Sequence, residues 1–425
     1  MENTLERKKA LLIAAYHGSQ ELLVCQEHLD ELSLLVDTYG VDTAAKIPCT
    51  LRKVDASTYF SKGKLQELLL KAQELQVDMI IIDEEINPSQ QRNLEKLFGR
   101  TVMDRAEVIL GVFGQRAQTK EARLQIELAQ VKYQIPRLKR LWTHLSRQAG
   151  TMGGGGAYLK GEGEKQIELD KRILRKKGED LQKELDEVRL HRSTQRQTRQ
   201  RSAIPSFAIV GYTNAGKSTL LNALTNADVF TEDKLFATLD TTTRRYTLSN
   251  QQDILLIDTV GFIRKLPHLL VAAFKSTLEE ALFADILLHV IDVSHPLAEE
   301  QAQTTFEVLK ELNAGKKPII TILNKSDKPE VKDRAFKLKL KYPKCISLSA
   351  LNQTGFEDLA NAMIEEIKNQ RAMVQLRIPQ SDYAVVSEIL REGIVFQQEY
   401  VDDFIDMKAE IPTLLALRLQ KYTHE

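Results

Sequence analysis

The sequence predicts an α/β fold whose largest unit has a mainly parallel sheet. From about residue 203 to 370, a buried strand, a glycine-rich turn and a helix follow one another repeatedly. Strand-like and helical runs also alternate ahead of this region, and a shorter set follows it. A chain of 425 residues exceeds what one hydrophobic core usually serves. We therefore expect several domains arranged along the chain.

Residues 1–114 are expected to form a small α/β domain of the nucleotide-binding-like type. Apolar strand-like runs at 10–16 and 79–82 alternate with amphipathic helical runs at 65–75 and 88–97. This alternation is typical of strands joined by covering helices.

Residues 115–202 are expected to form a helical hairpin linker. Two apolar stripes recur at mostly helical spacing, one between 120 and 147 and the other between 167 and 188. They comprise Leu124, Leu128, Val131, Ile135, Leu138, Trp142 and Leu145, and then Ile167, Leu174, Leu181, Leu185 and Val188. Pro136 should kink the first helix, and a glycine-rich loop at 150–163 should join the two.

Two features of this linker have open interpretations. The glycine-rich loop is either a plain connection or an RNA contact, since glycine lets a backbone approach phosphate closely. A run of arginines is either a solvated helix end or a nucleic-acid contact. It contains Arg189, Arg192, Arg196, Arg199 and Arg201.

The third unit, residues 203–370, contains a P-loop motif. The buried-strand run 207–210 opens directly into a glycine-rich loop followed by a helix, which is the context that this motif requires. The loop consists of Gly211, Tyr212, Thr213, Asn214, Ala215, Gly216, Lys217 and Ser218, with Thr219 behind it. Backbone amides and the helix N-terminus would hold phosphates, Lys217 would bridge the β- and γ-phosphates, and Ser218 would ligate Mg²⁺.

A second strand, 254–257, ends in Asp258, Thr259, Val260 and Gly261. This order places a carboxylate at the strand's C-terminal edge, where it can hold magnesium through water. It also places the Gly261 amide near the γ-phosphate. Asp-x-x-Gly alone is a weak signal, but downstream of a P-loop it is specific.

The residues after a third strand, 318–323, predict which base is bound. They include Asn324, Lys325 and Asp327. The Asp327 carboxylate can accept hydrogen bonds from guanine N1–H and the exocyclic amine, whereas adenine would leave it unpaired. Later in the chain, Ser349, Ala350 and Leu351 occupy the position where backbone amides read the guanine carbonyl. Together these motifs predict GTP and GDP as ligands and GTP hydrolysis as the activity.

The segment 236–244 should contain the switch that closes on GTP. One of its threonines is expected to reach magnesium and the γ-phosphate, and we favour Thr238, with Thr241 and Thr242 as rivals. Phe236 is counted among the nucleotide-binding residues. Lys217, Thr238 and Gly261 are the candidate catalytic residues.

The residue after Gly261 is Phe262, where the best-known switches have a glutamine that orients the attacking water. An apolar ring cannot do this, so hydrolysis should be slow unless a partner or another residue supplies the missing group. The Asn214 carbonyl could join phosphate oxygens around K⁺, which makes potassium a second candidate cation.

The residues resemble the HflX family of GTPases over most of the chain. In the N-terminal half, the similar stretches are 60–64, 88–94 and 123–138; in the switch domain they are 236–244 and 258–267. Two positions differ, since the family usually has proline where Thr241 stands, and Gly-Pro-Gly-Glu-Thr-Gln where this chain has residues 161–166.

The resemblance implies a ribosome-associated GTPase that binds the large ribosomal subunit and its RNA, as a monomer, through the N-terminal domain and linker. It also implies dissociation of stalled ribosomes under stress. An ATP-dependent RNA-remodelling or ribosome-assembly factor and a nucleotide-bound scaffold with little turnover are the alternatives. Residues 371–425 are expected to form a small α/β domain whose role the sequence does not assign.

The net charge does not indicate whether the partner is a polyanion such as RNA, because basic and acidic residues are equal at 59 each. The three cysteines are far apart and lack metal-ligand spacing, which suits a reducing compartment. No apolar stretch approaches the roughly 18 residues of a membrane helix. We therefore expect a cytoplasmic protein.

Overall fold

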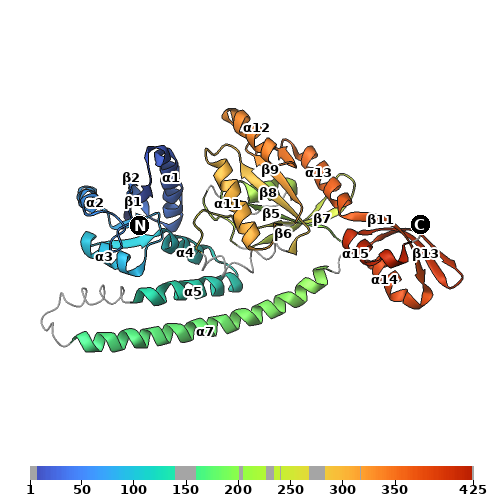
Figure 1. Ribbon diagram of the computed structural model, residues 1–425, viewed down its shortest axis with the longest axis horizontal. Coiled ribbons are helices and arrows are strands. Elements are labelled where there is room, and N and C mark those ends of the chain that lie inside the picture. The colour runs from blue at the N-terminus through green and yellow to red at the C-terminus, as the bar shows by residue number, and fades with distance from the viewer. Residues whose placement is uncertain are drawn as a thin grey trace, which may run out of the picture.

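The computed structural model describes residues 7–138, 159–200, 204–225, 234–239, 241–267, 283–315 and 317–423. Two α/β units lie side by side, a long helical hairpin runs beneath them, and a small unit with the C-terminus lies at the far end (Figure 1). The expected fold class, a mainly parallel α/β domain with smaller units before and after it, is confirmed.

The N-terminal unit is a parallel four-stranded sheet of order β2-β1-β3-β4. Its strands are β1 (Lys9–Tyr16), β2 (Asp42–Thr50), β3 (Met79–Ile82) and β4 (Thr101–Asp104). Its helices are η1 (Ser19–Glu21), α1 (Leu22–Tyr39), α2 (Lys62–Glu74), α3 (Pro88–Phe98) and α4 (Arg105–Arg116). Separate apolar clusters fill the two faces of the sheet.

The sequence analysis identified β1, α2, β3 and α3 in this unit but not α1, β2, β4 or α4. Strand β2 is at the sheet edge, and most of its residues are only half-buried, so its apolar pattern is weak. A capping box stabilises the start of α3, because the Asn87 side chain accepts hydrogen bonds from the Ser89 and Gln90 amides. The Gln90 side chain accepts one from the Asn87 amide in return.

The linker contains α5 (Lys120–Gln134), η2 (Ile135–Arg137) and α7 (Leu159–Gln200). The two predicted stripes meet, because Leu124, Leu128 and Val131 of α5 pack against Leu181 and Leu185 of α7. The pairing of the two helices along these stripes is therefore confirmed.

Two details of the linker differ from expectation. Pro136 lies in the 3₁₀ turn where α5 ends, because proline lacks the amide that would continue the helix. Helix α7 already begins at Leu159, so Gly161 and Gly163 are helical, since the charged residues around them favour a helix. The rest of the glycine-rich loop, the side chains of the arginine run, and Trp142 and Leu145 are outside the described residues.

The third unit has a six-stranded sheet of order β10-β9-β8-β5-β7-β6, in which only β6 is antiparallel to its neighbour. Its strands are β5 (Ser206–Gly211), β6 (Thr242–Thr247), β7 (Asp253–Asp258), β8 (Ile286–Asp292), β9 (Ile319–Asn324) and β10 (Cys345–Ser347). Its helices are α8 (Lys217–Thr225), α11 (Ala298–Glu311), η3 (Pro329–Val331), α12 (Lys332–Lys341) and α13 (Phe356–Asn369). Because β5, β7 and β9 are parallel, their C-terminal ends meet at one edge of the sheet.

The C-terminal unit is an antiparallel sheet of order β11-β13-β12, with two helices packed on one face. Its elements are β11 (Arg371–Pro379), η4 (Gln380–Asp382), α14 (Tyr383–Glu392), β12 (Ile394–Val401), β13 (Phe404–Pro412), α15 (Thr413–Arg418) and η5 (Gln420–Tyr422). Within the described ranges, no helix is long and apolar enough to cross a membrane.

Candidate nucleotide-binding site

The P-loop turns tightly between β5 and α8. Gly216 has a φ of +90°, and a Cβ atom there would lie 2.3 Å from Asn324 Nδ2. Only glycine fits this position without displacing the Asn324 side chain. The loop therefore curls so that a phosphate could lie against its backbone.

Lys217 is buried at the base of this loop, where its Nζ donates a hydrogen bond to the Tyr212 carbonyl at 2.8 Å. Burial lowers the pKa of Lys217 to about 8, and the neighbouring Asp258 carboxylate opposes this effect. A buried ammonium group is stabilised by a nearby anion. A nucleotide phosphate would supply that anion.

Three side-chain oxygens converge beside Lys217. The Ser218 hydroxyl donates to Asp258 Oδ2 at 2.5 Å and lies 2.7 Å from the Thr238 hydroxyl. Burial raises the pKa of Asp258, although Lys217 and several hydrogen bonds counteract this. The other carboxylate oxygen, Oδ1, is buried and has no hydrogen-bond partner among the described residues.

This set of oxygens fits a magnesium ion. Mg²⁺ prefers oxygen ligands and usually binds one or two carboxylates together with substrate phosphates. Of the three candidate threonines, Thr238 is the one whose hydroxyl contacts Ser218. Thr242 is instead part of β6, where it pairs with Asp258 in the sheet.

The segment after Asp258 is fixed against the P-loop. The Thr259 hydroxyl donates to the Ile209 carbonyl at 2.7 Å, so this side chain ties β7 to β5. A Cβ atom on Gly261 would lie 2.7 Å from Thr213 Cα and 2.9 Å from Lys217 Nζ. Only a residue without a side chain can bring its backbone this close to the loop.

Phe262 pairs with the P-loop through its backbone and packs its ring inside. Its amide donates to the Gly211 carbonyl at 3.0 Å, and its carbonyl accepts from the Thr213 amide at 2.7 Å. The ring is only 1% exposed and belongs to an apolar cluster that also contains Val260. The Phe262 side chain is therefore directed into the protein core.

Asn324 joins the P-loop to the two motifs predicted to read guanine. Its amide group donates to the Ala215 carbonyl at 2.9 Å and accepts from the Ala350 amide at 3.0 Å. Lys325 donates to the Asn214 carbonyl at 3.1 Å and forms an ion pair with Asp292 at 2.7 Å.

The residues predicted to contact the base differ in exposure. The Asp327 side chain is exposed three residues after β9. Ser349 and Ala350 are buried, and Leu351 is 78% exposed.

A cavity lies over the P-loop. It is lined by Thr213, Asn214, Gly216, Lys217, Ser218, Thr219, Lys234, Phe236, Ala237, Thr238, Thr259 and Gly261. The sequence analysis did not count Lys234 or Ala237 among the nucleotide-binding residues; Ala237 follows Phe236 directly, and Lys234 lies two residues before it. The sequence analysis also missed Asp292, a carboxylate at the C-terminal end of β8 that the strand pattern could have indicated.

Comparison with known protein families gives three successive matches. Residues 26–114 match the family described as GTP-binding GTPase N-terminal, and residues 116–199 match GTP-binding GTPase Middle Region. Residues 206–325 match the family described as 50S ribosome-binding GTPase.

Individual relatives match over nearly the full chain. A protein of Chlamydia pneumoniae named GTPase HflX is 47% identical over 97% of this chain and 88% of its own length. One of Akkermansia muciniphila with the same name is 43% identical over 98% of this chain and 97% of its own. A solved structure of a GTP-binding protein from Sulfolobus solfataricus with GDP is 28% identical, covers 84% of this chain and 98% of its own, and has a TM-score of 0.43.

Proposed function

Because this chain belongs to the HflX family of GTPases, we propose that it is a GTP-driven switch that acts on the large ribosomal subunit. The chain is a GTPase, since its curated relatives are GTPases and its P-loop domain has the corresponding fold. The observation that carries the proposal is the meeting of phosphate, magnesium and guanine motifs at one edge of the six-stranded sheet. The ribosomal target is supported by the family match of this domain.

In this proposal each cluster has a separate task. The P-loop amides and Lys217 hold the β- and γ-phosphates, and the Gly261 amide contacts the γ-phosphate. Ser218 and Thr238 would hold magnesium, with Asp258 acting through water, and the ion would neutralise charge on the phosphates. Asp327 pairs with guanine, and the backbone of 349–351 meets its carbonyl.

The attacking water needs a group other than Phe262. That ring is buried and carries no polar atom, so it cannot orient water. We infer that the ribosome completes the site, either by supplying a group or by repositioning one within the chain. The consequence for the cell would be splitting or rescue of stalled ribosomes under stress.

The test is GTP turnover by the purified protein with and without large ribosomal subunits, at fixed magnesium and potassium. We expect stimulation by roughly 10²-fold or more, as for other switches that receive a missing catalytic group from a partner. Small subunits serve as the control. An unchanged rate would contradict the ribosomal target and favour the scaffold alternative.

Two further assays separate the remaining alternatives. A ribosome-splitting factor should shift intact ribosomes to free subunits when GTP is present. An ATP-dependent RNA-remodelling factor should instead unwind duplex RNA with ATP. Splitting without unwinding would support the proposal, and the reverse would support the alternative.

Potassium is proposed as a second cation of the site. Asn214 lines the cavity together with Lys217 and Thr238, so its amide oxygen could bind K⁺ beside phosphate oxygens. Turnover should then be several-fold higher in KCl than in NaCl at equal ionic strength, and Asn214→Ala should remove the difference. Equal rates in the two salts would rule out this role.

A further inference from the structure

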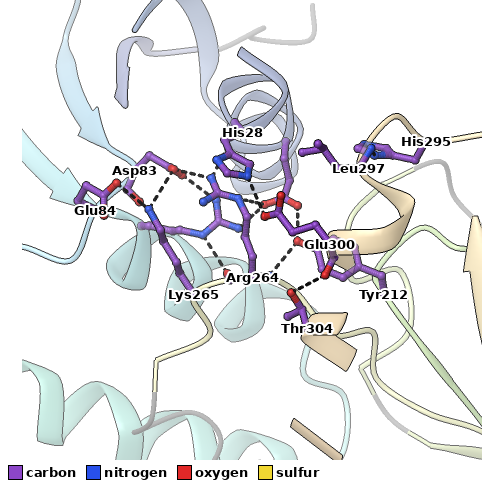
Figure 2. Close-up of polar contacts among 12 residues, drawn as sticks. His28, Asp83, Glu84, Tyr212, Arg264, Lys265, His295, Leu297, Glu300 and Thr304 are labelled. Carbon is purple, nitrogen blue, oxygen red and sulfur yellow. Dashed lines mark hydrogen bonds and ion pairs between the residues drawn. The ribbon is translucent and has the colours of Figure 1, made fainter. Parts of the chain in front are cut away.

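The N-terminal unit contacts the switch that follows Gly261 through buried charges. Arg264 and Lys265 of that switch point at Asp83 and Glu84, which follow β3 (Figure 2). Arg264 Nη2 donates to Asp83, and its Nε lies 3.2 Å from Glu31 Oε1 on α1. The Lys265 ammonium lies 2.6 Å from Glu84. Switch II, defined here as residues 258–267, is therefore held by carboxylates of another unit.

One of these carboxylates, Glu31, also reaches the P-loop. The Tyr212 hydroxyl donates to Glu31 Oε2 at 2.5 Å and accepts the backbone amide of Arg264 at 2.8 Å. Tyr212 is buried, so its ring extends from the phosphate-binding loop into the junction between the two units. One phenol thus links the P-loop, switch II and α1.

Charge in this junction is balanced only when the two units are together. Arg105 at the start of α4 also contacts Asp83, at 2.8 Å, and Glu31. The Asp83, Arg105 and Arg264 side chains are each less than a tenth exposed. Burial alone would raise the pKa of Asp83, but Arg105 and Arg264 hold it below its usual value. A buried charge without its partner is strongly unfavourable.

Switch I, defined here as residues 234–244, meets the same unit through an apolar contact. The Phe236 ring packs edge-on against Phe113 of α4, with ring centroids 4.5 Å apart and an interplanar angle of 68°. Both rings are almost fully buried. The Phe236 amide also donates to the Thr213 hydroxyl at 2.9 Å. Thr238, which contacts Ser218, is only two residues further along.

In this structure the switch positions and the contacts with the N-terminal unit occur together. Thr238 lies beside Ser218, and Gly261 lies against the P-loop; we take these as the closed positions of the two switches. In this arrangement the N-terminal unit contacts Phe236 and Arg264 as well. If this contact is better formed with the switches in these positions, it favours the ligand that holds them there, by reciprocity of linked equilibria.

We propose that Glu31, Asp83 and Phe113 are specificity-determining residues for GTP over GDP, although none of them lines the cavity over the P-loop. They stabilise the closed positions of switches I and II, which GTP requires for its γ-phosphate contacts. GTP binding and docking of the N-terminal unit thus strengthen each other. GDP, which lacks the γ-phosphate, gains nothing from the docked unit.

The test compares the affinities of a non-hydrolysable GTP analogue and of GDP by titration with the full chain. Glu31→Gln keeps the shape of the side chain but leaves Arg264 and Tyr212 facing a neutral amide. We expect analogue affinity to fall by roughly tenfold, within the usual range of coupling between sites, and GDP affinity to change by less than about twofold. Asp30→Asn is the matched control, because it is the adjacent residue of α1 and pairs only with Lys46 on the surface in the contacts described.

A second variant tests the proposal independently, in case Glu31→Gln does not fold. Phe113→Leu removes the ring contact with Phe236 but retains an apolar side chain. It should also lower analogue affinity selectively. Phe98→Leu, a buried ring on the opposite face of the N-terminal sheet, is its control. Equal losses for analogue and GDP, or no loss in either junction variant, would overturn the proposal.

Discussion

Replacing Lys217 by methionine is expected to lower kcat/KM for GTP by roughly 10²–10³-fold, as for other groups that stabilise developing charge. Methionine is an unbranched side chain only one atom shorter than lysine, but it cannot place a positive charge against the β- and γ-phosphates. The measurement is single-turnover hydrolysis with large ribosomal subunits present. Lys328→Met, an exposed lysine after β9, is the control.

The same change should not unfold the nucleotide-free protein. Burial lowers the pKa of Lys217 to about 8, which means that folding opposes its charge when no phosphate is bound. A neutral side chain of similar length should therefore leave the Tm of the apo protein unchanged or slightly higher. A large fall in Tm together with lost turnover would indicate a structural role and contradict this prediction.

Replacing Asp327 by asparagine is expected to weaken GTP binding by about 10³-fold or more, because sites that pair polar groups discriminate by up to roughly 10⁴–10⁵. The carboxylate accepts two hydrogen bonds from guanine, whereas the asparagine amide can accept on one side and donates on the other. Xanthine has an oxygen in place of the exocyclic amine, so the variant should bind xanthosine triphosphate instead. Equilibrium titration with both nucleotides measures this change of specificity from guanine to xanthine.

Asp333→Asn, in the first turn of α12, is the control for the loss of a nearby exposed carboxylate. It should leave affinity for both nucleotides unchanged. If the Asp327 variant keeps its guanine affinity, recognition of the base must depend on the 349–351 backbone and Asn324 instead. If it loses guanine without gaining xanthine, the loop itself has been disturbed.

Local signals in the sequence determined a large part of this protein. Around 207–224 a strand, a glycine turn and a helix follow one another directly. The P-loop motif therefore predicts the local strand–loop–helix structure by itself. The Asp258 and Asn324 motifs each end a buried strand, and parallel strands carry their C-terminal ends to one edge. The apolar stripes of α5 and α7 likewise fixed their pairing, because helical spacing places those residues on one face.

Other features depended on contacts between distant segments. The sequence already favoured Thr238, but its contact with the Ser218 hydroxyl depends on the folded arrangement. The burial of the Phe262 ring likewise depends on the surrounding core. Most clearly, Glu31, Asp83 and Arg105 carry no motif, and they lie more than 150 residues from Arg264 in sequence. Charge pairing has no sequence period, so only the folded arrangement could reveal that segments 234–244 and 258–267 contact the N-terminal unit.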